Sequence, residues 1–250
     1  MKNALMMSAL SILMFGSVQA NAASGHQWTK ADVDQYMAIM GNLKGIKALP
    51  GTGFAVAEGA GETFMISSDG RFVMRQVEVL DTWNGKVIRN LQDTASLDRI
   101  DFASMKLKLD ELLTFTVGNP KAPENVIFID PRCGYCKGMI EQIKKMQATH
   151  RFRIVVSAIL GEESIEIAKK LACMDRSQAT SAILNSNYQS LPAMKDGCDT
   201  EPMSRALIVT RLLGRNAVPF VVSSTGDVHR GFVKDLQAKL TADLTRATAR

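Results

Sequence analysis

Two of the four cysteines in this chain are separated by only two residues, Cys133 and Cys136 in the stretch DPRCGYCK. Such a pair can bind zinc, form a fixed structural disulfide, or open and close as a redox centre. A closed zinc site needs four ligands, but the other cysteines form no second pair of this kind and the three histidines are isolated (His26, His150 and His229). A permanent disulfide in so tight a ring is also less favoured. The pattern therefore favours a redox centre.

The flanking segments predict a role for each thiol. Residues 125–129 (NVIFI) are a continuous apolar run typical of a buried strand, and residues 138–149 carry apolar side chains at helical spacing. A cysteine between them lies at the start of a helix, where unpaired N–H groups stabilise a thiolate, the species that attacks disulfides. We expect Cys133 to be this nucleophile and Cys136, one turn further in, to resolve the mixed disulfide. Gly134 and Tyr135 between them set the geometry of the ring.

Two other positions fit redox chemistry. Asp130 ends the buried strand and could accept the proton of Cys136 during exchange, while a turn or capping acid is an equal alternative. Val218 and Pro219 begin a strand after a loop. A cis peptide bond there would leave the backbone of Val218 free to pair with a substrate near the sulfur, and a trans proline at the first residue of a strand is the alternative.

The remaining two cysteines, Cys173 and Cys198, predict a structural disulfide. They lie in a helical region later in the chain, and no pattern around them points to a reactive thiol. Closing such a loop stabilises the folded chain by restricting the unfolded one. A second redox pair is the less favoured alternative.

The N-terminus predicts export. Lys2 is followed by an apolar run over residues 4–18 and then by the small residues Ala20 and Ala22. This pattern predicts a cleaved secretory signal peptide over residues 1–22, with cleavage after Ala20 as the second choice. An uncleaved anchor or a buried helix is less favoured, because polar residues follow at once. An oxidising compartment also suits a chain that uses disulfides.

The charge pattern predicts no nucleic-acid partner. The chain has 30 basic and 25 acidic residues, a net charge of +5, and these residues are interspersed along its length. The usual sequence signature of a nucleic-acid-binding groove is a run of basic residues, or basic residues that alternate with aromatic ones. The mild positive balance therefore indicates solubility.

Residues 23–94 predict a small N-terminal domain. Apolar side chains recur at helical spacing over residues 28–43 behind Thr29, a plausible N-cap. Three short β-prone segments at 53–57, 63–67 and 71–79 are separated by glycine-containing turns, which predicts an antiparallel meander. So small a sheet is marginal alone, so we expect a homodimer formed across an edge strand. A monomeric subdomain packed on the rest of the chain is the alternative.

The rest of the chain predicts a linker and an α/β domain. Residues 95–113 repeat apolar side chains close to helical spacing and predict a connecting helix. Strands and helices then alternate: strands at 114–117, 125–129 and 151–160, helices at 165–186 and 202–213, a hairpin at 219–233 and a closing helix at 234–247. We therefore expect an α+β protein whose second domain spans residues 114–250, with a helical insertion at about 161–215.

Together these motifs resemble the DsbC/DsbG family of periplasmic thiol:disulfide interchange proteins. The likeness rests on the Cys-Gly-Tyr-Cys pair behind Asp-Pro-x, the helical insertion with its own cysteines, the Val-Pro before the last hairpin, and the small N-terminal domain. It implies a thioredoxin-like catalytic domain and a cystatin-like N-terminal dimerisation domain, in a V-shaped homodimer that cradles misfolded substrates. It also implies that the cysteine pair works without a cofactor and is kept reduced by a membrane reductase of the DsbD type.

One residue departs from that family. DsbC-like proteins usually carry Thr before the cis proline, whereas this chain has Val218, as oxidases of the DsbA type do; Phe220 after the proline is also bulkier than expected. We interpret the chain as a periplasmic disulfide isomerase and reductase with chaperone activity. The alternatives are a DsbA-like oxidase, which Val218 favours and the dimerisation domain opposes, and a holdase chaperone whose apolar surface matters more than its thiols.

Overall fold

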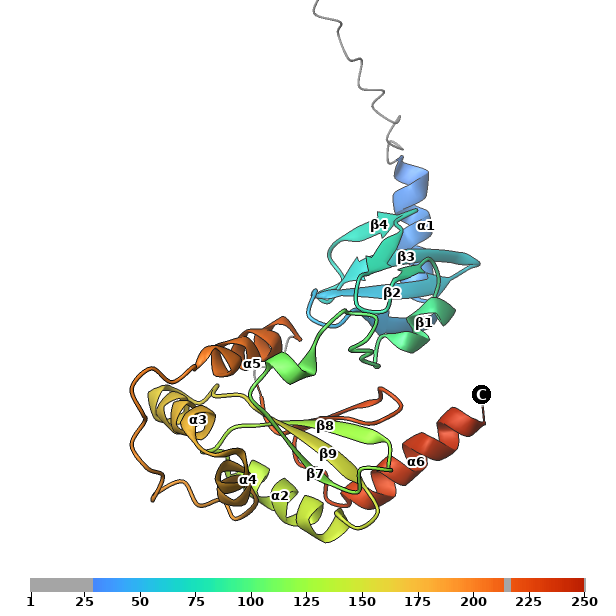
Figure 1. Ribbon diagram of the computed structural model, residues 1–250. Coiled ribbons are helices and arrows are strands. Elements are labelled where there is room, and N and C mark those ends of the chain that lie inside the picture. Colours follow the sequence, from blue (N-terminus) through green and yellow to red (C-terminus); the bar gives the residue numbers. More distant parts are fainter. Residues whose placement is uncertain (1–28, 214–216, 250) are drawn as a thin grey trace, which may run out of the picture. The chain divides into compact units, whose positions relative to one another are not determined.

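The structure is a computed structural model that describes residues 29–213 and 217–249 (Figure 1). The predicted signal peptide lies outside the described residues. The chain divides into two compact units, residues 1–42 and residues 43–250. Within the described residues no helix is both long and apolar enough to span a membrane. The predicted domain boundaries at residues 94 and 113 stay predictions.

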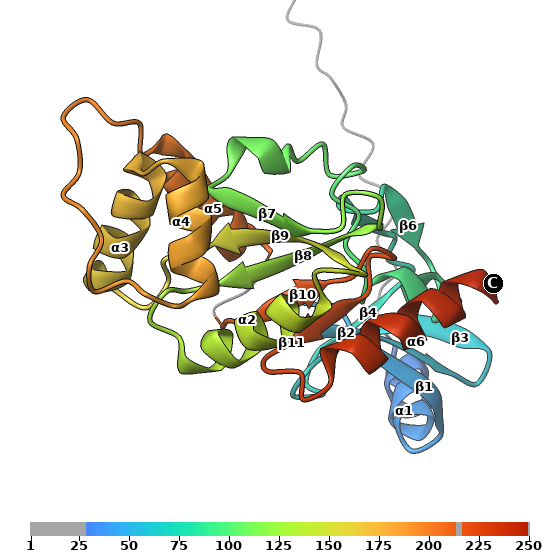
Figure 2. The ribbon, with the colours of Figure 1, turned by 60° about the horizontal axis from the view of Figure 1, so that its bottom comes forward.

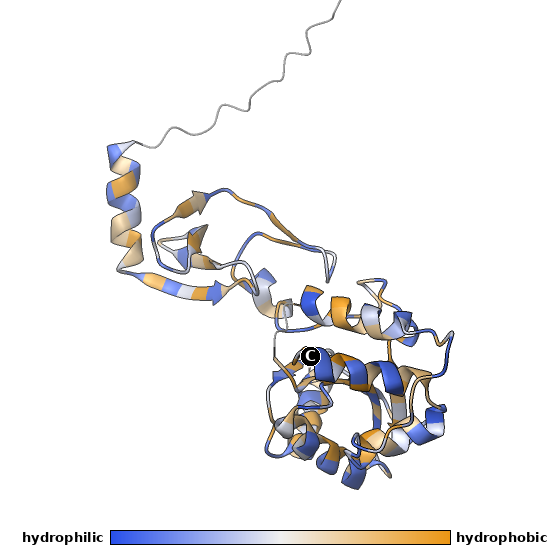
Figure 3. Ribbon diagram, turned by 90° about the vertical axis from the view of Figure 1, so that its left-hand side faces the viewer, coloured by the Kyte–Doolittle hydropathy of each residue, from blue (hydrophilic) through white to orange (hydrophobic). Residues whose placement is uncertain are grey.

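The described part of the first unit is one helix, α1 (Lys30–Met40). Thr29 caps it as predicted: its hydroxyl accepts the N–H of Asp32 at 3.2 Å, and the Asp32 carboxylate accepts the N–H of Thr29 at 2.9 Å. The predicted helix extended to residue 43, but α1 ends at Met40. Figure 3 shows hydrophobic and hydrophilic bands alternating along α1, and its apolar Val33 and Met37 are 50% and 71% exposed.

A four-stranded antiparallel sheet opens the second unit, in the order β1-β2-β3-β4. Its strands confirm the predicted meander and add a first strand that was missed because its apolar residues are interrupted by lysines: β1 (Leu43–Ala48), β2 (Phe54–Gly59), β3 (Glu62–Ser67) and β4 (Val73–Arg75). A hairpin of β5 (Val79–Asp81) and β6 (Lys86–Ile88) follows. One small hydrophobic cluster here consists of Leu49, Val56, Met65 and Ile88, and Phe64 and Ile66 of β3 are also buried. The cystatin-like fold and the homodimer stay predictions.

The predicted linker helix over residues 95–113 is wrong. The segment holds the end of one 3-10 helix, η1 (Gln92–Ser96), and a second, η2 (Leu109–Glu111), with turns between them. Asp101 competes with helical hydrogen bonding, because its carboxylate accepts the backbone N–H groups of Ala103 and Ser104 at 3.0 and 3.2 Å. Lys106 has a positive φ of 54°, which also ends any regular helix.

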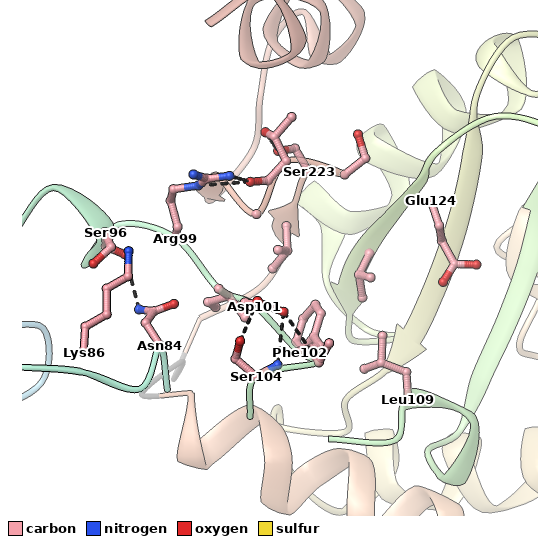
Figure 4. Close-up of a pocket in the computed structure, with 17 residues that line it drawn as sticks. Asn84, Lys86, Ser96, Arg99, Asp101, Phe102, Ser104, Leu109, Glu124 and Ser223 are labelled. Atoms are coloured by element: carbon pink, nitrogen blue, oxygen red, sulfur yellow. Dashed lines mark hydrogen bonds between the residues drawn. The ribbon is translucent and has the colours of Figure 1, made fainter. Parts of the chain in front are cut away.

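Contacts with a distant hairpin hold this segment in place. Ile100 donates its N–H to the carbonyl of Gly226 at 2.8 Å, and the Arg99 guanidinium donates to the carbonyl of Thr225 (Figure 4). A Cβ on Gly226 would lie 2.9 Å from the Ile100 carbonyl oxygen, so only glycine allows this approach. Tertiary contacts therefore replace the helix that the apolar spacing suggested.

The rest of the second unit is built on a five-stranded mixed sheet in the order β11-β10-β8-β9-β7. The central pair, β8 and β9, is parallel, and the other neighbours are antiparallel. The strands are β7 (Thr114–Gly118), β8 (Glu124–Ile129), β9 (Arg151–Val156), β10 (Phe220–Val222) and β11 (Val228–Arg230). Side chains of β8 from Asn125 to Ile129 are all buried, as expected for a strand covered on both faces.

Helices cover both faces of this sheet (Figures 1 and 2). Helices α2 (Gly134–Met146) and α6 (Leu236–Thr248) contact each other on one face, and α5 (Glu201–Leu212) contacts β9 on the other. The sequence β8-α2-β9 followed by β10-β11-α6, with β8 between β9 and β10, is a thioredoxin-like arrangement. This part of the fold prediction is confirmed.

The helical insertion contains two helices where one was predicted over residues 165–186. They are α3 (Glu162–Cys173) and α4 (Arg176–Leu184). Asp175 ends the first and caps the second, since its side chain accepts the N–H groups of Ser177 and Gln178 at 2.9 and 3.3 Å. The predicted disulfide between Cys173 and Cys198 is confirmed, with an S–S distance of 1.96 Å and Cα atoms 5.6 Å apart.

Candidate active site

The two closely spaced cysteines lie where β8 ends and α2 begins. Cys133 is the N-cap residue of α2, and its Sγ accepts the backbone N–H of Cys136 at 3.2 Å. Cys133 is half-buried, whereas Cys136 is only 2% exposed. The two thiols are not bonded to each other. The structure thus places one accessible sulfur at the helix start and one protected sulfur a turn behind it, as the sequence predicted.

A loop far along the chain completes the surroundings of Cys133. The peptide bond between Val218 and Pro219 is cis, as predicted, and the Cys133 thiol donates to the Val218 carbonyl at 3.4 Å. Phe220, which looked too bulky from the sequence, is fully buried and stacks on Phe128 of β8 with ring centroids 4.2 Å apart. Its bulk therefore packs β10 against β8 in the core.

Cys136 lies in an environment that opposes ionisation. Burial raises the pKa of the Cys136 thiol far above its ordinary value, the hydrogen bond with Cys133 raises it further, and the negative charge of Asp130 adds to the effect. A raised pKa keeps the thiol protonated at neutral pH. Cys136 must therefore lose a proton before it can attack a disulfide, and this step becomes easier as the pH rises.

Asp130 is 1% exposed and makes three hydrogen bonds. Its carboxylate accepts the N–H of Arg132 at 2.8 Å, the N–H of Leu160 at 2.9 Å and the hydroxyl of Ser164 at 2.7 Å. These bonds tie the turn before Cys133 to the segment just before α3 and to α3 itself. The role of Asp130 as a turn acid is therefore visible in the structure, and its role as proton acceptor stays a prediction.

Replacing Asp130 with asparagine is expected to lower the free energy of unfolding by about 2 kcal/mol, because an amide cannot satisfy the three donors that surround the carboxylate. Urea unfolding followed by circular dichroism measures this change. Asp69→Asn is the matched control, since Asp69 lies in an exposed turn. Equal unfolding midpoints for the two variants would contradict the prediction.

Two exposed aromatic side chains lie together near the start of α2. Tyr135, between the two cysteines, is 70% exposed, and its ring lies 6.2 Å from that of Phe232, which is 44% exposed. A Cβ on Gly138 would lie 2.9 Å from the Phe232 ring, so the glycine in α2 makes room for this pair. An exposed aromatic surface is therefore present on the first turns of α2, the helix that Cys133 caps.

Comparison with known proteins gives weak likenesses. No model of a known protein family and no curated protein matches this chain. Among solved structures, a disulfide interchange protein from Neisseria gonorrhoeae matches 55% of this chain and 98% of its own with 20% identity and a TM-score of 0.46. The thiol-disulfide exchange protein alpha-DsbA2 from Wolbachia pipientis matches 58% and 93% with 17% identity and a TM-score of 0.43. The catalytic domain of Proteus mirabilis ScsC matches 60% and 97% with 19% identity and a TM-score of 0.41.

These values assign the chain to no family. The observations that bear on its chemistry are its own: the two thiols, the cis Val218-Pro219 bond and the buried Asp130. Within residues 29–213 and 217–249, no group of three or more His, Cys, Asp or Glu side chains could hold a metal ion.

Sequence reasoning missed two residues of the site, Ser186 and Tyr188. Both follow α4 and line a small pocket together with Cys133, Cys136 and Asp130. Burial raises the pKa of Tyr188, and the charges of Cys136 and Asp130 raise it further. No motif marks these positions in the sequence. Only the positive φ of 50° at Ser186, a property of the folded backbone, distinguishes the turn that carries them.

Proposed function

We propose that this protein is an exported disulfide isomerase and reductase that reshuffles incorrect disulfides in other exported proteins. The observation that carries the proposal is the accessible Cys133 at the N-terminus of α2, with the buried Cys136 behind it and the Val218 carbonyl 3.4 Å away. Cys133 is the N-cap residue of α2, so its sulfur lies at the first turn of the helix and can be reached from solvent. A thiolate that is open to solvent is the attacking group in disulfide exchange.

The reaction runs in successive thiol-disulfide exchanges. The Cys133 thiolate attacks one sulfur of a substrate disulfide, a mixed disulfide forms, and the other substrate sulfur leaves as a thiolate. In isomerisation that thiolate attacks a different substrate disulfide, and the thiolate released there attacks the mixed disulfide and frees Cys133. In reduction Cys136 attacks Cys133 and releases the substrate reduced. In the second case the enzyme dithiol is oxidised to a disulfide and one substrate disulfide becomes two thiols. A membrane reductase of the DsbD type, implied by the family resemblance, would return the dithiol.

The surface around Cys133 suits unfolded polypeptides. Tyr135 and Phe232 offer an apolar contact that an unfolded segment can reach and a folded one buries. The backbone of Val218 beside the sulfur offers a hydrogen-bonding contact that does not depend on the substrate sequence. Both contacts support a broad range of misfolded substrates and a modest chaperone activity.

Homodimerisation through the first part of the chain belongs to this proposal. Strand β1 is an edge strand of the four-stranded sheet, and its Ile46 is 57% exposed. An unpaired edge that carries an exposed apolar side chain is a natural site for pairing with a second copy. Two copies would give each substrate two reactive cysteines.

Val218 supports a second candidate, an oxidase that donates a disulfide to folding proteins. The residue lies against the reactive sulfur and is the type found in DsbA-like oxidases. An oxidase needs its reduced form to be the more stable one, which gives a strongly oxidising potential. The isomerase and the oxidase therefore differ in the redox potential expected for the Cys133-Cys136 pair.

The test combines two measurements on the full-length mature protein. Equilibration with glutathione buffers and thiol trapping give the potential of the Cys133-Cys136 pair, and refolding of a scrambled multi-disulfide protein gives isomerase activity. We expect rescue of the scrambled substrate and a moderately oxidising potential. A potential near the oxidising extreme, about −120 mV, with no rescue would favour the oxidase. Suppressed aggregation without any disulfide exchange would favour a holdase.

A further inference from the structure

A narrow pocket of about 160 Å³ lies beside the two reactive cysteines. Three parts of the chain line it: Asp130 at the end of β8, Cys133 and Cys136 at the start of α2, and the turn after α4 with Ser186 and Tyr188. Since one water molecule occupies about 30 Å³ in the liquid, the pocket is large enough for a few. It is therefore a space through which a proton can leave the buried thiol.

The resolving step needs such a route. Cys136 is 2% exposed, and its thiol must lose a proton before the sulfur attacks Cys133 in a mixed disulfide. Asp130 is the carboxylate that lines the pocket, but both of its oxygens already accept hydrogen bonds, from Arg132 and Ser164 on one and from Leu160 on the other. Accepting a proton would weaken this arrangement.

Tyr188 is a second polar group at the same pocket. Its ring packs against the core of the second unit, and its hydroxyl makes no hydrogen bond to another side chain or backbone group of residues 29–213 and 217–249. Tyr188 as a whole is half-buried, and its hydroxyl oxygen is not among the fully buried side-chain atoms that lack a partner, so its hydrogen-bond partner is water. The pocket beside Cys136 is the space where water can supply that partner.

The charged side chains around the pocket do not block the path of the Cys136 proton to solvent. Arg132 forms an ion pair with Glu163 at 3.0 Å, and both side chains are about half-exposed, at 45% and 67%. Lys137 also lines the pocket but is exposed to bulk solvent. The burial and the nearby negative charges that raise the pKa of Tyr188 keep its hydroxyl protonated, so it can both donate and accept a hydrogen bond at neutral pH.

We propose that Tyr188 is a positioning residue for the resolving step: its hydroxyl holds a water molecule in the pocket, and this water carries the proton of Cys136 to solvent. The Cys136 sulfur then forms a bond to Cys133, the bond between Cys133 and the substrate breaks, and the substrate sulfur leaves as a thiolate that takes a proton from solvent. The proposal rests on the proposed function and assigns a role to the helical insertion that carries Tyr188.

The test is a single-turnover reaction of the reduced full-length protein with a peptide that contains one intramolecular disulfide. Acid quenching and mass spectrometry follow the mixed disulfide with time over a range of pH. In Tyr188→Phe we expect mixed disulfide to form at the wild-type rate and to decay about tenfold more slowly at neutral pH. This is less than the roughly hundredfold or greater loss typical of a direct acid or base, because Tyr188 acts through a water molecule. The difference should shrink at alkaline pH, where hydroxide removes the proton directly.

Tyr36→Phe is the matched control, because it removes a tyrosine hydroxyl from α1, which belongs to the first unit and not to the pocket of Cys136. Decay at the wild-type rate and with the wild-type pH profile in Tyr188→Phe would overturn the proposal. Equal slowing of formation and decay would also overturn it, because that result indicates a general structural effect. If the wild-type protein forms no mixed disulfide at all, the proposed function itself fails, and the two failures are thereby distinguished.

Discussion

Replacing Cys133 with serine is expected to abolish disulfide exchange, with a loss of roughly a thousandfold or more in rate, because the hydroxyl is far less nucleophilic than a thiolate. Cys133 is the half-buried sulfur of the pair, and only it can meet a substrate disulfide. The assay is reduction of a scrambled multi-disulfide protein. Far-ultraviolet circular dichroism and titration of free thiols confirm that the variant is folded and keeps the Cys173–Cys198 disulfide.

Cys136→Ser separates the two roles. The Cys133 thiolate should still attack, but the mixed disulfide should accumulate, because the buried resolving thiol is gone. Denaturing electrophoresis without reductant would show the trapped adduct. If the mixed disulfide instead accumulated in Cys133→Ser and not in Cys136→Ser, Cys136 would be the nucleophile and Cys133 the resolving cysteine.

Removing the Cys173–Cys198 disulfide is expected to cost about 3.5 kcal/mol of stability, the chain-entropy value for the 25-residue separation. The bond joins the end of α3 to the segment before α5 and encloses α4. The double variant Cys173→Ala/Cys198→Ala should therefore unfold at a lower temperature by roughly 10 °C, as measured by calorimetry.

The matched control for this variant is Cys133→Ala/Cys136→Ala. It also removes two sulfur atoms but breaks no covalent link, since these cysteines are free. We expect its stability to change by no more than about 1 kcal/mol. Similar losses for the two double variants would mean that the disulfide does not constrain the insertion as the structure indicates.

The helical insertion connects the stability prediction for the Cys173–Cys198 disulfide with the proposed role of Tyr188. The disulfide restrains the chain around α4, and the turn after α4 carries Tyr188 to the pocket of Cys136. Loss of the disulfide is thus expected mainly to lower the stability of the fold, and to a smaller extent to slow the attack of Cys136 on the mixed disulfide. Measurement of mixed-disulfide decay in the double variant would show whether this restraint also serves the chemistry.

Several features of this protein follow from local sequence. The Cys133-Gly134-Tyr135-Cys136 spacing predicts a redox pair, because a strand-to-helix junction and a two-residue gap bring both sulfurs to one helix start. The run NVIFI predicts a strand buried on both faces, since no polar alternation interrupts it. Thr29 predicts the start of α1, because its hydroxyl accepts the backbone N–H of Asp32 and the Asp32 carboxylate accepts the backbone N–H of Thr29. Each of these depends on residues that are near one another in the chain.

Other features depend on contacts that no local pattern contains. The apolar spacing of residues 95–113 fits a helix, but Asp101 and the contacts of Arg99 and Ile100 with a distant hairpin produce turns instead. The approach of Val218 to Cys133 and of Tyr188 to Cys136 joins segments that lie far apart in the sequence. Local sequence by itself determined the position of the two closely spaced cysteines at the start of a helix, and the main strands and helices. The tertiary structure decided which distant groups surround the pair, because packing across the sheet and the insertion fixes those distances.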